Sequence, residues 1–351
     1  MASRANCVQD DFFAPALVRW QLAHGRHDLP WQNTCDPYRV WLSEIMLQQT
    51  QVVTVRDYFV RFMTRFPDVV TLANASQDDV LGLWSGLGYY SRARNLHRCA
   101  QDVVRLYNGA FPTTALQLQT LPGIGRSTAA AIASLCFGER VAILDGNVKR
   151  VLTRYLGFDA DLALSVNAQC LWQEATRLLP PETLPTTMPR YTQAVMDLGA
   201  TVCTARKPAC ADCPLKTQCS AHASGSPEKF PVKTRKLKRG TQSIWLLWAK
   251  TDTGAIWLSK RPAPGVWAGL YCFVLFDDRA SLQAALPQGL QNQLHDVPVV
   301  KHVLTHKDLY LYPVKVVLHK DYLPSPEGAW FEEAQWPQLG LPAPVRKLLA
   351  T

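Results

Sequence analysis

The chain has 351 residues, 48% of them hydrophobic and 19% charged, and its 37 lysines and arginines exceed its 28 acidic residues by 9. This composition excludes a mostly disordered chain, and 19 glycines and 24 prolines without a period exclude a collagen-like one. The length predicts about two domains, and the charge predicts a polyanionic partner, nucleic acid before an anionic membrane surface.

The termini and the cysteines indicate a compartment. No run approaches the roughly 18 apolar residues of a membrane span, and the first residues lead into Asp10 and Asp11, not into the apolar core of a signal peptide. We therefore expect a cytoplasmic protein without a membrane partner. Because disulfides are rare in a reducing compartment, a tight cluster among the ten cysteines predicts metal binding.

Residues 8–222 show the three- and four-residue apolar spacing of helices. One helix is predicted to begin at Asp36 and Pro37, an N-cap acid followed by proline at the first helical position. On this helix Glu44 shares a face with apolar neighbours, so its carboxyl group is predicted to be desolvated and to hold its proton near neutral pH, as a general acid must. The alternative is a Glu at the edge of an apolar stripe, paired with an arginine.

Residues 121–125, Leu-Pro-Gly-Ile-Gly, end one helical stretch and lead into an alanine-rich helix over residues 127–137. Two glycines one residue apart permit a tight turn with positive φ, and the N–H groups of the next helix are then free to bind a phosphate. The alternative is an ordinary turn between helices. Asp145 follows an apolar run and precedes another helix, where the residues alone favour a helix N-cap.

Four cysteines follow a helix predicted over residues 191–199. Their spacing is C-x6-C-x2-C-x5-C, and all-thiolate ligand sets suit either tetrahedral zinc or an iron–sulfur cluster. A single C-x2-C with wider arms favours iron–sulfur, because zinc ribbons pair two short knuckles. In either case the metal ligands would be Cys203, Cys210, Cys213 and Cys219. The remaining alternative is four structural cysteines that bind no metal.

Residues 225–240 are rich in lysine and arginine and indicate a linker, either a solvated tether or a strap that binds phosphate. Alternating and β-branched runs follow at residues 244–249, 255–259, 271–276 and 309–318, and they predict a smaller α+β domain.

The hairpin over residues 121–130 resembles the helix-hairpin-helix of a DNA glycosylase superfamily that includes endonuclease III, and the cysteine segment is similar to that superfamily's [4Fe-4S] loop. The resemblance implies a multidomain chain: an all-α glycosylase domain over residues 1–224 with its cluster loop at 203–219, a basic linker over 225–240, and an α+β domain over 241–351.

Three longer segments, residues 41–52, 86–96 and 145–151, resemble signature runs of the MutY family of adenine DNA glycosylases. That family resemblance implies that Glu44 protonates adenine at N7, that Asp145 stabilises the cationic sugar and that Asn147 orients the site. The base must also leave the duplex stack. The resemblance implies DNA contacts at Gln49, Tyr89, Gly123, Gly125, Ser127 and Lys149, with Gln49 and Tyr89 filling and wedging the duplex; the alternative for Tyr89 is a core aromatic.

Residues 256–262 and 265–273 resemble the Nudix-like domain of that family, which recognises 8-oxoguanine opposite the adenine. The family's Phe-Ser-His loop corresponds to Leu304, Thr305 and His306, so the hydroxyl and the imidazole are retained and the aromatic ring is not. The implied partner is double-stranded DNA with adenine opposite 8-oxoguanine or guanine, bound by a monomer associated with a bacterial nucleoid.

Two other functions remain open. An endonuclease III-like glycosylase and lyase acting on oxidised pyrimidines would carry a Schiff-base lysine two residues after the second hairpin glycine, where this chain has Ser127. Lys149 is a nearby amine, with a phosphate contact as its expected role. A DNA-binding or iron–sulfur sensing protein without activity would not need both Glu44 and Asp145 on their motifs.

Overall fold

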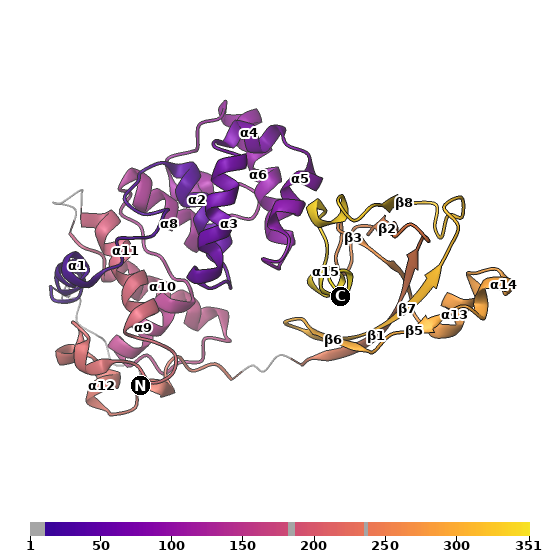
Figure 1. Cartoon of the computed structure of the whole chain (residues 1–351). Coiled ribbons are helices and arrows are strands. Elements are labelled where there is room, and N and C mark those ends of the chain that lie inside the picture. Colours follow the sequence, from indigo (N-terminus) through magenta and orange to yellow (C-terminus); the bar gives the residue numbers. More distant parts are fainter. Residues whose placement is uncertain (1–10, 182–186, 235–237) are drawn as a thin grey trace. The chain divides into compact units, whose positions relative to one another are not determined.

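The computed structural model describes residues 11–181, 187–234 and 238–351, and the chain forms two compact units (Figure 1). Unit 1 comprises Met1–Val70 and Arg98–Arg235, and unit 2 comprises Thr71–His97 and Lys236–Thr351. The sequence analysis did not anticipate that residues 71–97 belong with the C-terminal part. One boundary therefore falls inside helix α6 (Ser91–Tyr107).

Unit 1 is helical, as its apolar spacing predicts. Helix α11 (Thr187–Thr201) packs against α1, α8 and α9 (Figure 1). Small residues make this close packing possible, since five consecutive residues of α8, 129–133, are buried and four of them are alanines. The other helices are α1 (Phe13–His24), α2 (Pro37–Leu47), α3 (Val52–Arg65), α4 (Val69–Asn74, which crosses into unit 2), α7 (Ala115–Leu118), α8 (Arg126–Phe137), α9 (Gly146–Leu156), α10 (Ser165–Arg177) and α12 (Ser220–Ala223).

The local signals for helix starts hold where they were predicted. Asp36 caps α2 by accepting a hydrogen bond from the Tyr38 N–H at 2.9 Å, and Pro37 occupies the first helical position. Helix α8 ends at Gly138, which adopts the left-handed conformation that favours glycine. Helices α2 and α8 pack against each other, and this contact brings the helix of Glu44 beside the glycine hairpin.

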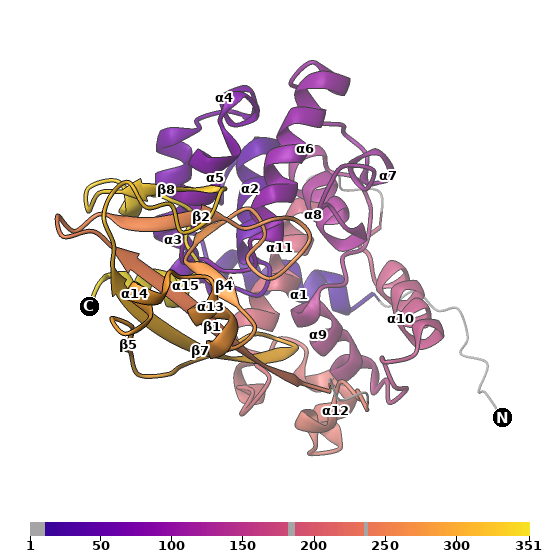
Figure 2. The ribbon, with the colours of Figure 1, turned by 90° about the vertical axis from the view of Figure 1, so that its right-hand side faces the viewer.

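Unit 2 contains one twisted sheet whose central strands, β1 (Gly240–Lys250) and β7 (Lys307–Val317), run parallel in register from Gly240 opposite Lys307 to Lys250 opposite Val317 (Figure 2). The strand order is β3-β2-β1-β7-β5; β4 also pairs with β1, β6 with β7 and β8 with β2. The remaining elements are β2 (Ile256–Lys260), β3 (Tyr271–Cys272), β4 (Val274–Phe276), β5 (His295–Asp296), β6 (Val300–Val303), β8 (Gly328–Phe331), α13 (Arg279–Ala284), α14 (Gln288–Gln291) and α15 (Ala343–Leu349).

The segment predicted as one strand over residues 271–276 is two short strands with different partners. Strand β3 pairs with β2, and β4 pairs with β1. Phe273 lies between them, fully buried and stacked on Trp248 at a centroid distance of 5.3 Å. Burial of this ring at the point where the chain changes partner explains the break.

Residues 71–97 contribute α5 (Gln77–Trp84) and the first part of α6 to unit 2. The Tyr90 hydroxyl donates to the Leu341 carbonyl at 2.8 Å, and Arg94 donates to the Ala268 carbonyl at 2.7 Å. Leu81 is buried. A Cβ added at Gly340 would lie only 2.9 Å from the Cβ of Leu81. Among the described residues, no helix is long and apolar enough to cross a membrane.

Candidate active site

A pocket of about 630 Å³ in unit 1 gathers the three residues predicted to be catalytic. Helix α2 supplies Glu44, and the N-terminus of α9 supplies Asp145 and Asn147. Gln49 and Ser127, predicted to contact DNA, also line this pocket. The packing of α2 on α8 therefore assembles side chains that lie about 100 residues apart in the sequence.

Glu44 has the electrostatic properties of an acid that retains its proton. Burial and, to a smaller extent, the nearby Asp145 carboxylate together raise the pKa of Glu44 to about 7. The side chain is partly accessible because it opens into the pocket, yet protein surrounds it and keeps it from bulk water. At neutral pH a large fraction of Glu44 is protonated.

Asp145 is both a helix cap and a pocket carboxylate. Its Oδ1 accepts a hydrogen bond from the Val148 N–H at 2.7 Å, which confirms the N-cap interpretation. Burial raises the pKa of Asp145, while the backbone N–H groups of Val148 and Asn147 and the cations Arg150 and Lys149 act to lower it. These opposing effects favour an ionised Asp145 beside a protonated Glu44 more than burial alone would.

Two positioning residues, Arg150 and Gly199, were missed by the sequence analysis. Arg150 donates to the Asn147 side-chain oxygen at 2.8 Å, to the Gly199 carbonyl at 2.6 Å and to the Cys203 carbonyl at 2.7 Å. A Cβ added at Gly199 would lie 2.8 Å from the Cβ of Asn147, so only glycine allows α11 to approach α9 so closely. No local signal identifies these contacts, because both depend on the crossing of α9 and α11.

The glycine hairpin leads into an open helix N-terminus. Gly123 adopts φ +78°, whereas Gly125 is extended and precedes α8 without a side-chain cap. A Cβ added at Gly125 would meet nothing within 4 Å, so the surface above this helix N-terminus is free. The N–H groups of the first turn of α8 are suited to a phosphate. Ser127 is engaged internally, because its Oγ accepts from the Leu144 N–H at 3.0 Å.

Of the other predicted DNA contacts, Gln49 and Tyr89 are exposed and Lys149 is partly buried. Gln49 is exposed and has φ +57°. Lys149 lies on α9, one turn after Asp145. Tyr89 belongs to unit 2, has φ +47° and is 45% exposed, so it is not a core aromatic.

The turn between β6 and β7 carries Leu304, Thr305 and His306, far in sequence from the pocket residues but in the same unit as Tyr89. Thr305 and His306 are exposed. The Thr305 hydroxyl shares a hydrogen bond with the Tyr89 hydroxyl at 3.0 Å. The residue predicted to wedge the duplex and the turn predicted to read the opposite base are thus in direct contact.

The four cysteines Cys203, Cys210, Cys213 and Cys219 line one cavity in unit 1. Burial raises the pKa of Cys213 to about 11, so a ligated cation would be needed to hold this thiol as a thiolate. Arg154 donates to the Cys203 sulfur at 3.4 Å and supplies positive charge beside it. An all-cysteine set of four thiolates suits either tetrahedral zinc or an iron–sulfur cluster, so this cavity alone does not choose between them.

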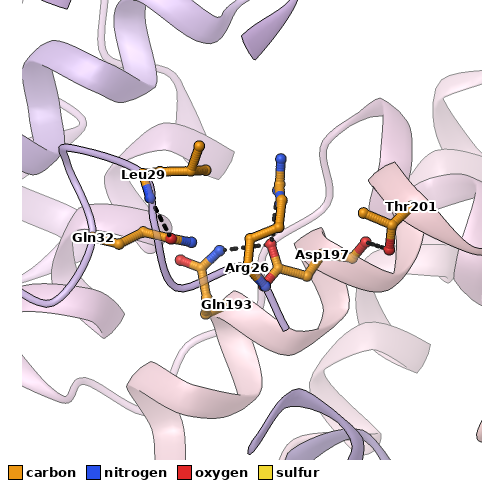
Figure 3. A network of polar contacts seen from close by, with 6 residues as sticks. All are labelled: Arg26, Leu29, Gln32, Gln193, Asp197 and Thr201. Atoms are coloured by element: carbon orange, nitrogen blue, oxygen red, sulfur yellow. Dashed lines mark hydrogen bonds and ion pairs between the residues drawn. The ribbon is translucent and has the colours of Figure 1, made fainter. Parts of the chain in front are cut away.

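A buried ion pair holds α11 to the loop before α2 (Figure 3). Asp197 is 0% exposed and accepts from the Arg26 backbone N–H at 3.1 Å and from its Nε at 2.8 Å. Gln193 donates to the same carboxylate at 3.0 Å. Since Met196 on the same helix lines the catalytic pocket, this contact fixes one wall of it.

Comparisons with known proteins match segments of both units. Residues 42–174 match the HhH-GPD superfamily of base excision DNA repair proteins, residues 203–219 match the iron–sulfur binding domain of endonuclease III, and residues 244–351 match a NUDIX domain. The cysteine segment is therefore an iron–sulfur binding segment, as its spacing favoured over zinc.

Solved structures give the same fold for unit 1. A thermostable thymine-DNA glycosylase is 28% identical with a TM-score of 0.54, covering 60% of this chain and 95% of its own. Endonuclease III in a non-covalent DNA complex is 20% identical with a TM-score of 0.51, and the match covers 63% of this chain and 98% of the endonuclease chain. The latter likeness supports the fold alone.

Relatives cover nearly the whole sequence. The adenine DNA glycosylase of Buchnera aphidicola (subspecies Acyrthosiphon pisum) is 36% identical over 342 residues, 96% of each chain. The human adenine DNA glycosylase is 44% identical over 218 residues, 60% of this chain and 39% of the human one. With a full-length relative at this identity, a helix-hairpin-helix unit, an iron–sulfur segment and a NUDIX domain, the chain belongs to the adenine DNA glycosylase family of base excision repair.

Proposed function

We propose that the protein hydrolyses the N-glycosidic bond of adenine paired with 8-oxoguanine or guanine in duplex DNA, with Glu44 as the general acid. The observation that carries this proposal is the pocket in which Glu44, with its pKa raised to about 7, faces Asp145. Two carboxyl groups with different pKa values in one pocket can serve as proton donor and as anion at the same pH.

The reaction begins with proton transfer from Glu44 to N7 of an adenine that has left the stack. Protonation lets the base depart neutral, with the electron pair of the C1′–N9 bond, because an unprotonated adenine would leave as an anion. The sugar becomes an oxocarbenium-like cation, and the Asp145 carboxylate stabilises it electrostatically. The Glu44 carboxylate then accepts a proton from the attacking water, and this step regenerates the acid.

Asn147 and Arg150 orient these groups. The Arg150 guanidinium holds the Asn147 side-chain oxygen, so the amide N–H₂ of Asn147 is directed away from Arg150. In this proposal Asn147 acts on the sugar or the water, and Arg150 acts only by position.

A monofunctional hydrolase fits the hairpin better than a lyase. A lyase needs an amine to form a Schiff base, and the corresponding position holds Ser127, whose hydroxyl is bonded to the Leu144 backbone. We expect no covalent complex when the protein is treated with borohydride during turnover. Stoichiometric trapping through Lys149 would favour the bifunctional alternative.

In this proposal DNA is bound by residues of unit 1 around the glycine hairpin and the pocket, and by Tyr89 of unit 2. The N-terminus of α8 with Gly123 and Gly125 binds phosphate, Ser127 lies beside it in the first turn, and Lys149 contributes charge. Gln49 and Tyr89 fill the space that the extruded adenine leaves. The protein acts as a monomer on double-stranded DNA.

The turn of Leu304, Thr305 and His306 reads the opposite base. Thr305 and His306 offer a hydroxyl and an imidazole that can bond to the groups distinguishing 8-oxoguanine from guanine. The hydrogen bond between Thr305 and Tyr89 supports this role, because it connects the turn proposed to contact the opposite base with the residue proposed to insert into the duplex.

The cofactor is a [4Fe-4S] cluster held by Cys203, Cys210, Cys213 and Cys219. An all-cysteine set of four thiolates is the usual ligand set of such a cluster. When bound, the cluster would fix the loop that carries Arg206, Lys207 and Lys216. The role of these basic residues is contact with the DNA backbone.

One experiment tests the proposed function. Duplexes with adenine opposite 8-oxoguanine, guanine or thymine are incubated with the protein, and alkali-labile sites are measured on each strand. We expect adenine loss opposite 8-oxoguanine and guanine, little opposite thymine and none from the other strand. Cleavage at oxidised pyrimidines instead would support the endonuclease III-like alternative.

A further inference from the structure

The β6–β7 turn that carries Thr305 and His306 is attached to the end of the basic linker. The turn is closed by a backbone hydrogen bond from the Leu304 N–H to the Lys307 carbonyl at 2.8 Å. The Gly240 N–H donates to the His306 carbonyl at 3.0 Å. Residues at the start of β1 therefore bear directly on the position of the turn.

Arg239, immediately before β1, holds the turn at its other end. Its Nη2 donates to the Leu304 carbonyl at 2.9 Å and also forms an ion pair with the Asp308 carboxylate. The Leu304 carbonyl belongs to the peptide group that links Leu304 to Thr305. Arg239 thus holds the backbone one bond away from the residue proposed to read the lesion.

Asp308 connects this arginine to the opposite strand. Its second oxygen accepts from Lys301 of β6 at 2.9 Å, and Val303 of β6 is its strand partner. The Asp308 side chain is 19% exposed, compared with 43% for Arg239, so the ion pairs are partly shielded from solvent. The hydrogen bonds from Lys301 and Arg239 lower the pKa of Asp308, which keeps the carboxylate charged at neutral pH.

The arrangement leaves Thr305 held from two sides. Its hydroxyl is bonded to Tyr89, and its backbone is held through Leu304 by Arg239. The Thr305 hydroxyl can discriminate between 8-oxoguanine and guanine only if its position is fixed before the DNA binds, because a mobile hydroxyl can adapt to either base. Neither Arg239 nor Asp308 needs to touch the base for this effect.

We propose that Arg239, Asp308 and Lys301 form a brace that positions the Leu304–Thr305–His306 turn, which makes Arg239 and Asp308 positioning residues for discrimination of 8-oxoguanine from guanine. This proposal rests on the proposed function of the turn. It also assigns the last arginine of the linker to specificity, where the sequence indicated a tether or a phosphate strap.

The test compares single-turnover rates of adenine release from duplexes with 8-oxoguanine or guanine opposite the adenine, using the full-length protein with its cluster. The variants are Arg239→Gln, Asp308→Asn and their combination, with Lys238→Gln as the matched control that removes an adjacent linker charge. We expect each brace variant to lower the ratio of the two rates roughly three- to tenfold. The rate on the guanine duplex should stay within about twofold, and Lys238→Gln should leave the ratio unchanged.

Two further readouts separate the brace from a direct phosphate contact and from general destabilisation. Asp308→Asn frees two cations, so affinity for the guanine duplex should rise or stay equal while the rate ratio falls. Arg239 and Asp308 act through one contact. The ratio of the two rates should therefore fall no further in the double variant than in the more affected single variant. Arg239→Lys, which keeps the charge but replaces the planar guanidinium by an ammonium group on a different stem, should be intermediate.

The outcomes distinguish the two levels of the proposal. A wild-type protein without any preference for 8-oxoguanine would overturn both the reading role of the turn and the brace. A wild-type preference that survives in Arg239→Gln and Asp308→Asn would overturn the brace alone. Loss of the ratio in Arg239→Gln but not in Asp308→Asn would show that Asp308 takes no part in positioning the turn and would also overturn the brace.

Discussion

The proposed role of Glu44 as an acid depends on where helix α2 places it. A glutamate on the surface would be almost fully ionised at neutral pH, whereas burial in the pocket and the neighbouring Asp145 raise the pKa of Glu44 to about 7. The sequence predicted a desolvated carboxyl group from the apolar face of this helix. The contribution of Asp145 depends on the tertiary fold, which places both carboxyl groups in one pocket.

Replacing Glu44 by glutamine should abolish adenine release. The change keeps the side-chain volume and removes the transferable proton, and it leaves the phosphate contacts intact. Single-turnover release should fall by at least about 10²-fold, the low end of a general acid's contribution, while duplex affinity changes only a few-fold. Glu174→Gln on the exposed side of α10 is the matched control; retained turnover in Glu44→Gln would remove Glu44 from the mechanism.

The rate of base release should fall as pH rises through about 7. The protonated form of Glu44 is the active one and its pKa is raised to about 7, so above that value the rate should drop by about tenfold per pH unit. Below about pH 6 the same group is almost fully protonated and should impose no loss. A single-turnover pH profile that stays flat from pH 6 to 9 would contradict the assignment.

At the scale of elements, α11 forms a wall of the pocket because one ion pair holds it. Arg26→Met would leave Asp197, at 0% exposure, with only a backbone N–H and Gln193 to compensate its charge. We expect a loss of roughly 2–4 kcal/mol in the free energy of unfolding, below the range for fully buried pairs because the Arg26 side chain is 24% exposed.

Asp197→Asn provides the comparison for that prediction. The amide oxygen can still accept from Arg26 Nε, but the amide N–H₂ would face the Arg26 backbone N–H and lose that hydrogen bond. Since no buried charge is left behind, the loss should be about 1–2 kcal/mol, smaller than for Arg26→Met. Thermal unfolding followed by circular dichroism would order the two variants. Equal losses would mean that the charge of Asp197 is not the source of the stabilisation.

The spacing of the four cysteines predicts which metal the purified protein contains. Purified protein should be brown and should contain iron and little zinc, since the four cysteines line one cavity and their segment matches an iron–sulfur binding domain. Elemental analysis together with the visible absorption spectrum measures this. One zinc and no iron per chain would reverse the assignment.

At the scale of the whole molecule, the residues proposed for catalysis and those proposed for specificity lie in different units. Glu44, Asp145 and the cysteines belong to unit 1, and Tyr89 and Thr305 belong to unit 2. Removal of residues 241–351 should therefore preserve adenine release from a guanine mispair and lower the preference for 8-oxoguanine about ten- to a hundredfold. It would also uncover Leu81, which packs beside Gly340, so the truncated protein should unfold at a lower temperature.

Thr305→Ala combined with His306→Ala tests the same point without uncovering the core. Both side chains are exposed, so the thermal stability should be unchanged while much of the preference is lost. A double variant, or a truncated protein, that keeps the full ratio of rates on 8-oxoguanine and guanine duplexes would show that discrimination does not come from this domain.

The sequence by itself determined the features that depend on neighbouring residues. Asp36 and Pro37 begin α2, Asp145 caps α9, and the spacing of the cysteines indicated iron–sulfur binding. The wide apolar stripes predicted a helical first part, and β-branched runs predicted strands after the linker. These signals are local, since a cap or a metal loop is satisfied within a few residues of its own position.

The tertiary structure alone decided which distant residues meet. The parallel pairing of β1 with β7, the contacts of Arg150 and Gly199 and the membership of residues 71–97 in unit 2 leave no periodic trace in the sequence. Each depends on how two elements cross, and packing chooses among many crossings that the same apolar pattern permits. Arg239 illustrates the difference: in the sequence it is one cation of a basic linker, and in the fold it holds the carbonyl next to Thr305.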